Sequence, residues 1–179
     1  MGNRSRVVLD SNCLSYLVDA LNAGSPPDTA DLLGVQKLAL ARIMFYDEWG
    51  LYVTPGVTDE CARIRNVGRA ELHTSWLDSI FTEVQPRNSS AILSRTAQLL
   101  TYHNDSDDCR ILAESEDASA RVLLTYDDKF ISRLSAQTNV RLMRAADYWI
   151  GLNIPKGAQP ETTPHAKNPL SSARWWRWE

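Results

Sequence analysis

Short apolar runs rich in β-branched residues alternate along this chain with longer segments whose apolar residues recur every three or four positions. The first run, Arg6–Leu9, is followed at once by Leu14, Leu17 and Leu21, which have the spacing of one helix face. Strands that alternate with helices pair in parallel, because each helix returns the chain across the sheet. The pattern therefore predicts an α/β fold of three layers, in which helices cover a mostly parallel sheet of about five strands.

The other elements are expected from the same signals. Further strands are expected at residues 51–54, 80–84, 121–125 and 140–143. Further helices are expected after Gly68, from Asn88 or Ser89, and over residues 107–116 and 145–152, with residues 126–128 forming an exit loop.

Two helix starts are predicted from local residue types. Asp28 is expected to cap a second helix whose inner face carries Leu32, Val35, Leu38, Ala39 and Ile43. Pro55 and the glycine after it are expected to end the second strand, so that a helix opens near Thr58.

The length of 179 residues suits one compact domain, and 44% hydrophobic residues exclude a disordered chain. The composition changes after Leu152, where prolines recur among small and polar residues. We therefore expect a domain over residues 1–152 and an extended arm over residues 153–179.

Tryptophans and arginines close this arm: Arg174, Trp175, Trp176, Arg177 and Trp178. Three bare tryptophans would make an apolar patch that proteins rarely leave exposed. The arm is expected to bind either its own domain or the second subunit of a homodimer, with its two arginines pairing with acidic residues.

Cys13, Cys61 and Cys109 are odd in number and lack a CxxC spacing, which favours a reduced, cytoplasmic setting. We expect the thiols to be small core residues. The histidines have no metal-ligand spacing and are interpreted as ordinary surface or helix residues. No run approaches the roughly 18 apolar residues of a membrane span, so no membrane association is expected.

Three carboxylates follow predicted strands. Asp10 ends the first strand, Glu60 lies just past the second, and Asp127 follows the fourth. The carboxyl ends of parallel strands meet at one edge of a sheet, so these acids should converge there. Asp108 is expected at a helix start, where the helix dipole favours a charged carboxylate.

Converging carboxylates repel one another, and a hard divalent cation such as Mg²⁺ or Mn²⁺ relieves that repulsion. Such an ion lowers the pKa of a bound water and stabilises charge on a phosphodiester under attack. The formal net charge is −3, so any nucleic-acid contact requires a local basic patch. Basic residues near the acids could supply phosphate contacts: Arg63, Arg65, Arg69, Arg110, Lys129 and Arg133.

Four segments, in order, resemble the sequence blocks of PIN-domain nucleases. Residues 8–14 resemble their opening, hydrophobic–Asp–Thr/Ser–Asn–x–Leu, and residues 54–63 resemble the block that carries a Glu on the helix after strand two. Residues 108–113 resemble Asp–x–x–Ile–x–Ala, and residues 125–130 resemble Thr–x–Asp–x–x–Phe. The match extends over roughly residues 7–152.

The resemblance implies a Mg²⁺- or Mn²⁺-dependent endoribonuclease whose metal ligands and catalytic acids are the acidic quartet Asp10, Glu60, Asp108 and Asp127. It leaves open whether the chain is the toxin of a toxin–antitoxin pair, with a protein antitoxin as partner. Five further residues are expected to orient the quartet or the phosphate from a second layer of residues around the metal: Ser11, Asn12, Asp107, Thr125 and Asp128. Lys129 stands where many members of the family have another acid.

Other interpretations remain open at this point. Singly, Asp10 and Asp108 could be helix caps, Glu60 could pair with Arg63, and Asp127 could be a turn residue. A haloacid-dehalogenase-type phosphatase would need an Asp where Asn12 stands. A catalytically silent PIN-like module that binds protein or RNA would differ from the nuclease in binding no metal.

Overall fold

The computed structural model describes residues 6–23 and 25–179, and its centre is a parallel sheet. Five strands form it in the order β3-β2-β1-β4-β5. Their bounds are β1 Arg6–Leu9, β2 Leu51–Val53, β3 Thr82–Glu83, β4 Ala120–Leu124 and β5 Arg141–Met143. All four pairings in the sheet are parallel.

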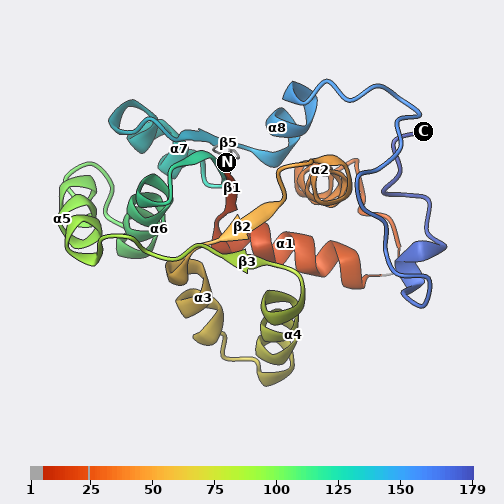
Figure 1. Ribbon diagram of the computed structural model, residues 1–179, viewed down its shortest axis with the longest axis horizontal. Coiled ribbons are helices and arrows are strands. Elements are labelled where there is room, and N and C mark those ends of the chain that lie inside the picture. Colours follow the sequence, from red (N-terminus) through yellow and green to blue (C-terminus); the bar gives the residue numbers. More distant parts are fainter. Residues whose placement is uncertain (1–5, 24) are drawn as a thin grey trace.

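Eight α-helices surround this sheet in the described part of the chain. Their bounds are α1 Ser11–Asn22, α2 Leu32–Tyr46, α3 Pro55–Ala62, α4 Val67–Ser79, α5 Ser89–Leu99, α6 Ser106–Asp117, α7 Asp128–Leu134 and α8 Ala145–Gly151. In Figure 1, α5, α6 and α7 lie on one side of the strands, and α1 and α2 lie on the other. The predicted three-layer α/β fold is thereby confirmed.

Strand β1 is the middle strand, and its burial explains the β-branched run in the sequence. Val7 pairs with Leu51 on one side and with Val122 on the other. Val7, Val8 and Leu9 are all buried, because helices cover both faces of a parallel sheet. The strand ends at Leu9, so Asp10 emerges at the carboxyl edge in the middle of the sheet.

The expected start of α2 was wrong, and so was the first turn of its expected inner face, although Ala39 and Ile43 are buried as predicted. Asp28 forms a turn in which its Oδ1 accepts from Ala30 N at 3.0 Å, and α2 begins after Asp31. Leu32 and Val35 lie exposed on the first turn, while most of the helix from Gln36 onward is buried or half-buried. A helix that is apolar on several sides gives a misleading stripe, because it is enclosed instead of lying on one surface.

The starts of α3 and α4 also differ from the expected positions, and α7 was not expected. Pro55 opens α3. A proline suits the first turn because its φ is already helical, and the backbone N–H that it lacks would have had no helical carbonyl as acceptor. Asn66 caps α4, so Gly68 lies inside this helix and does not separate it from α3. Tyr126 and Asp127 do form an exit loop, as predicted, and the Asp127 side chain in addition caps α7.

Residues 153–179 pack on the protein's own α2 and α8. The Trp176 side chain is fully buried, with its ring centroid 4.3 Å from that of Phe45. Trp178 N donates to the Tyr46 hydroxyl at 2.9 Å, and the Trp178 ring meets Trp149 edge to face. Figure 1 shows this blue segment descending beside α2. Of the two docking alternatives, the structure shows the intramolecular one.

The expected ion pairs of Arg174 and Arg177 were wrong. Within the described residues neither arginine pairs with an acid, and the Arg177 guanidinium lies 5.1 Å from the Trp176 ring centroid. An aromatic face attracts a cation and replaces the carboxylate. Over residues 6–23 and 25–179, no helix is both long and apolar enough to cross a membrane.

Candidate functional site

The carboxyl edge of the sheet is where the chain leaves β1, β2 and β4 in turn. Asp10 follows β1 directly, α3 with Glu60 follows β2, and Thr125 to Asp127 follow β4. Because β1 lies between β2 and β4, these three exits are neighbours. Helix α6, which carries Asp108, packs against both α3 and β4 and so reaches the same edge.

Asp10 is a buried carboxylate, with 3% of its surface exposed. It is the N-cap of α1, where its Oδ1 accepts from Cys13 N at 2.6 Å. Burial raises the pKa of Asp10, and hydrogen bonds from Thr125, Cys13 and Tyr126 offset part of that rise. The capping interpretation therefore holds for Asp10, but it does not remove this residue from the site.

Glu60 lies half-buried on α3 and accepts a hydrogen bond at Oε2 from the Ser11 hydroxyl at the start of α1. Its pKa is raised to about 7, first by burial and then by the charges of Asp107 and Asp108, with a smaller contribution from Asp10. Arg63 opposes this shift. The pKa of Glu60 thus reflects burial first and the neighbouring acids second.

Asp108 lies in the first turn of α6 but does not cap it, because Asp105 accepts from Asp107 N and Asp108 N. Its Oδ2 lies 2.8 Å from His103 Nε2. The pKa of Asp108 is raised to about 6, chiefly by burial; the His103 hydrogen bond lowers it, and the charges of Asp105 and Asp10 raise it further. Asp10, Glu60 and Asp108 therefore lie within electrostatic reach of one another.

Asp127 lies at the same edge, one strand from Asp10. Its Oδ1 accepts from Lys129 N at 2.7 Å and from Phe130 N at 3.1 Å, so this oxygen caps the N-terminus of α7. Thr125 lies beside both acids, because its Oγ1 accepts from Asp127 N at 3.1 Å and its side chain lowers the pKa of Asp10.

The donor set fits a hard cation in its chemistry, although the side chains are not placed around a common point. Among the described residues, no three His, Cys, Asp or Glu side chains are arranged to hold a metal ion. The donors are all carboxylate oxygens, and the pKa values of Glu60 and Asp108 are raised chiefly by burial and further by neighbouring negative charge, which a cation would compensate. Within the described part of the chain, Glu60 Oε1 and Asp108 Oδ1 accept no hydrogen bond.

The supporting residues named from sequence have different placements. Ser11 and Thr125 contact the acids, as described above. Asn12 is exposed on α1. Asp107 pairs with Arg63 at 2.7 Å, and Asp128 pairs with Arg144 at 2.6 Å.

The basic residues near the site are of two kinds. Arg63, with 59% of its side chain exposed, and the exposed Lys129 face solvent beside the acids. Arg110 instead lies 2.7 Å from Asp59 and 2.8 Å from Glu114, so two carboxylates already balance its charge. Arg133 makes a long contact of 3.4 Å to Asn104.

Cys13, Cys61 and Cys109 are free and buried, as predicted. His73 lies on helix α4, in keeping with the expectation, whereas the expectation for His103 was wrong because this residue is buried and lies outside any helix. His73 is satisfied by Ser15 Oγ at 3.0 Å and by the Arg69 carbonyl at 2.8 Å, which makes its burial tolerable.

Sequence patterns did not single out His103 and Glu114, although both touch the site's framework. Glu114 is buried and accepts from Gly56 N, which ties α6 to the first turn of α3. An acid among the apolar residues Ile111, Leu112 and Ala113 is a signal that could have found Glu114. His103 precedes the capping loop of α6, and no spacing signal marks it.

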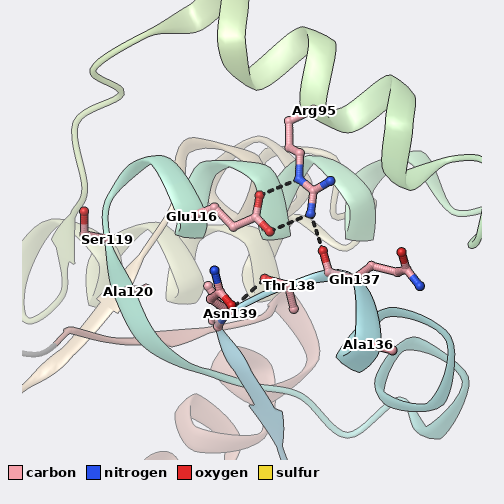
Figure 2. A pocket seen from close by; sticks show the side chains of 9 residues that line it. Arg95, Glu116, Ser119, Ala120, Ala136, Gln137, Thr138 and Asn139 are labelled. Atoms are coloured by element: carbon pink, nitrogen blue, oxygen red, sulfur yellow. Dashed lines mark hydrogen bonds and ion pairs between the residues drawn. The ribbon is translucent and has the colours of Figure 1, made fainter.

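A pocket of about 660 Å³ lies at the opposite edge of the sheet, beside the starts of β4 and β5. Figure 2 shows Arg95 reaching Glu116 across it, with a further bond to the Gln137 carbonyl. The charge of Arg95 is therefore already paired, and none of the four acids lines this pocket. We place the candidate site at the carboxyl edge instead.

The chain matches no model of a known protein family and no curated protein sequence with which it was compared. The assignment of a function therefore depends on the residues of this site.

Proposed function

We propose that this protein is a metal-dependent endoribonuclease that hydrolyses phosphodiester bonds of RNA with Mg²⁺ or Mn²⁺. The observation that carries the proposal is that Asp10, Glu60 and Asp108 lie near one another at the carboxyl edge, so that the charges of Asp108 and Asp10 add to the raised pKa of Glu60 and the charge of Asp10 adds to that of Asp108. Three elements far apart in sequence deliver these acids to one edge of the sheet. A protein gains no stability from such crowding, but a cation site needs it.

The acidic quartet would hold the ion or ions, with Asp127 as the fourth member. A bound Mg²⁺ or Mn²⁺ supplies a water of lowered pKa and stabilises charge on the phosphate oxygens. Asp10 is held in place by Cys13 N and Thr125, and Glu60 by Ser11. Asp127 would have to present an oxygen other than the Oδ1 that caps α7. The exposed basic side chains of Arg63 and Lys129 would contact phosphates of the RNA.

The PIN-like blocks and the α/β fold support the same assignment, and the three buried free cysteines suit a cytoplasmic enzyme. Within this proposal the chain could serve as the toxin of a toxin–antitoxin pair, with a protein antitoxin as its partner. A silent PIN-like binding module is the alternative that a metal measurement separates from the nuclease.

The test is cleavage of labelled RNA by the purified protein, with Mn²⁺ and with EDTA, for the wild type, Asp10→Asn and Asp78→Asn. Asp78 is exposed on α4 and serves as the matched control. We expect Mn²⁺-dependent cleavage that falls at least about 100-fold in Asp10→Asn, or roughly 2.7 kcal/mol of transition-state stabilisation. Asp78→Asn should cleave at the wild-type rate.

The Asp10→Asn protein should keep its fold, because Asn still offers an oxygen to Cys13 N and no longer buries a charge. Circular dichroism and the melting temperature check this. Wild-type cleavage by Asp10→Asn, or cleavage that persists in EDTA, would refute the mechanism. A well-folded wild type that binds no Mn²⁺ would identify the silent module.

A further inference from the structure

His103 is a buried imidazole held on several sides in the turn between α5 and α6. Only 4% of its surface is exposed. Its backbone N–H donates to the Leu99 carbonyl at 3.1 Å, and its own carbonyl accepts from Cys109 Sγ at 3.4 Å. The ring stacks on Phe130 with centroids 5.7 Å apart and planes 18° apart. Backbone and ring are thus both fixed, which fixes the direction of Nε2.

The Nε2 atom lies 2.8 Å from Asp108 Oδ2. An ionised carboxylate only accepts, so Nε2 carries the proton in this contact. The bond occupies Oδ2, whereas Oδ1 accepts no hydrogen bond from any residue that the structure describes. A rigid imidazole therefore holds one oxygen of the carboxylate and leaves the other available.

The same ring connects Asp108 to Asp127. Phe130, on which His103 stacks, lies in the first turn of α7, and its backbone N–H donates to Asp127 Oδ1 at 3.1 Å. Asp108 and Asp127 come from separate elements, and the His103–Phe130 stack is a packed contact between those elements. A change at His103 would reach both acids.

We propose that His103 is a positioning residue of this site, which holds Oδ2 of the Asp108 carboxylate and leaves Oδ1 available to a divalent cation. This inference rests on the proposed metal-dependent function. Hydrogen bonds behind a ligand orient it, and their loss typically weakens metal binding about 10–100-fold.

His73 provides an internal comparison. It is fully buried as well, but its ring nitrogens meet Ser15 Oγ and the Arg69 carbonyl, and none of its described hydrogen bonds goes to an acid. A merely structural histidine needs no carboxylate. Substitution at His73 should therefore change stability without changing metal affinity.

The test measures Mn²⁺ affinity of the full chain by titration calorimetry or electron paramagnetic resonance, beside RNA cleavage at varied Mn²⁺. His103→Phe keeps an aromatic ring against Phe130 but removes the donor. In His103→Gln, the side-chain amide nitrogen can reach the position of the imidazole Nε2. We expect His103→Phe to raise the Kd for Mn²⁺ about 10–100-fold. His103→Gln should restore affinity to within about threefold of wild type, and His73→Phe should bind Mn²⁺ as wild type does.

Saturating Mn²⁺ should recover most of the cleavage rate of His103→Phe, because the variant loses affinity for the ion and keeps the acids. Wild-type Mn²⁺ affinity in His103→Phe overturns the positioning role, and so does an equal loss in His73→Phe. If His103→Phe does not fold, His103→Asn takes its place, since its shorter amide does not reach Asp108. A wild type that neither binds Mn²⁺ nor cleaves RNA overturns the proposed function itself, and the role of His103 with it.

Discussion

The Glu114 carboxylate, in the middle of α6, accepts a hydrogen bond from the backbone N–H of Gly56 at 2.8 Å. Gly56 lies in the first turn of α3, where backbone N–H groups have no helical acceptor. The other Glu114 oxygen accepts from Arg110 Nε at 2.8 Å, and Arg110 also reaches Asp59 on α3. Glu114 therefore fastens together the helices that carry Glu60 and Asp108.

Glu114→Gln should destabilise the protein by about 1–3 kcal/mol, because the hydrogen bond from either Gly56 N or Arg110 Nε then loses its acceptor. The amide cannot accept at both of its polar atoms. Urea denaturation measures the free energy of unfolding. Glu71→Gln, an exposed position on α4, is the control and should change it by less than about 0.5 kcal/mol. Equal free energies for Glu114→Gln and wild type would show that this fastening contributes nothing.

The pH dependence of stability follows from Glu60, whose pKa is raised from 4.5 to about 7. Below pH 4.5 the folded and unfolded states both hold the proton. Between about 4.5 and about 7 the unfolded chain releases it and the folded protein keeps it, so the stability of the metal-free protein falls as pH rises. Asp108, with its pKa raised to about 6, acts in the same direction.

Melting temperatures from pH 4.5 to 8 check this, with Glu60→Gln as the comparison. The variant should lose less stability than wild type across this window, because position 60 no longer titrates. Added Mn²⁺ should reverse the trend in wild type, since the ion binds ionised carboxylates and stabilises the folded state. Parallel pH profiles for the two metal-free proteins would contradict the assignment of the shift to Glu60.

The geometry of a parallel β-sheet, in which the carboxyl ends of all strands lie at one edge, explains how much of this site could be predicted from sequence. Asp10, Glu60 and Asp127 were placed at one edge because each follows a buried apolar run, and the strand order makes those exits neighbours. His103 could not be found this way, because its contact with Asp108 depends on how α5, α6 and α7 pack. The start of α2 was missed because it depends on how closely the backbone of Asp28 approaches Gly34. A Cβ on Gly34 would lie 1.6 Å from the Asp28 carbonyl oxygen.

Arg63 and Arg110 are both near the acids, yet the structure predicts different consequences for their loss. Arg63 is exposed, and among the described residues it pairs with Asp107 alone, so Arg63→Ala should leave the melting temperature unchanged and weaken RNA binding. Arg110 joins Asp59 to buried Glu114, so Arg110→Ala should lower the melting temperature.

RNA binding is measured by fluorescence anisotropy across a salt series, in the Asp10→Asn background to prevent cleavage. Loss of one phosphate contact should reduce the slope of log affinity against log salt by about 0.7 in Arg63→Ala. An unchanged slope would remove Arg63 from the RNA-binding surface, and an unchanged melting temperature for Arg110→Ala would contradict its structural role.

Trp176 is the fully buried tryptophan of the arm over residues 153–179. Its buried ring packs on Phe45 and Tyr46, and its Nε1 donates to the Leu170 carbonyl at 3.1 Å. Trp176→Ala should cost about 3–5 kcal/mol, because a large cavity opens and the aromatic contacts are lost. At about 2–4 °C per kcal/mol for a chain of this size, even 3 kcal/mol lowers the melting temperature by roughly 6–12 °C. Trp175→Ala, at a half-buried neighbour, is the control and should cost less.

Truncation after Leu152 extends the same argument from one ring to the whole arm. It would uncover the apolar surface of Phe45, Tyr46 and Trp149, so the shortened protein should melt earlier and elute earlier as it self-associates. Because the arm docks within its own chain, the melting temperature of the full-length protein should not depend on protein concentration. A melting temperature that rises with concentration would instead indicate exchange of arms between two subunits. Equal melting temperature and elution volume for the truncated and full-length proteins would mean that the arm contributes nothing to the fold.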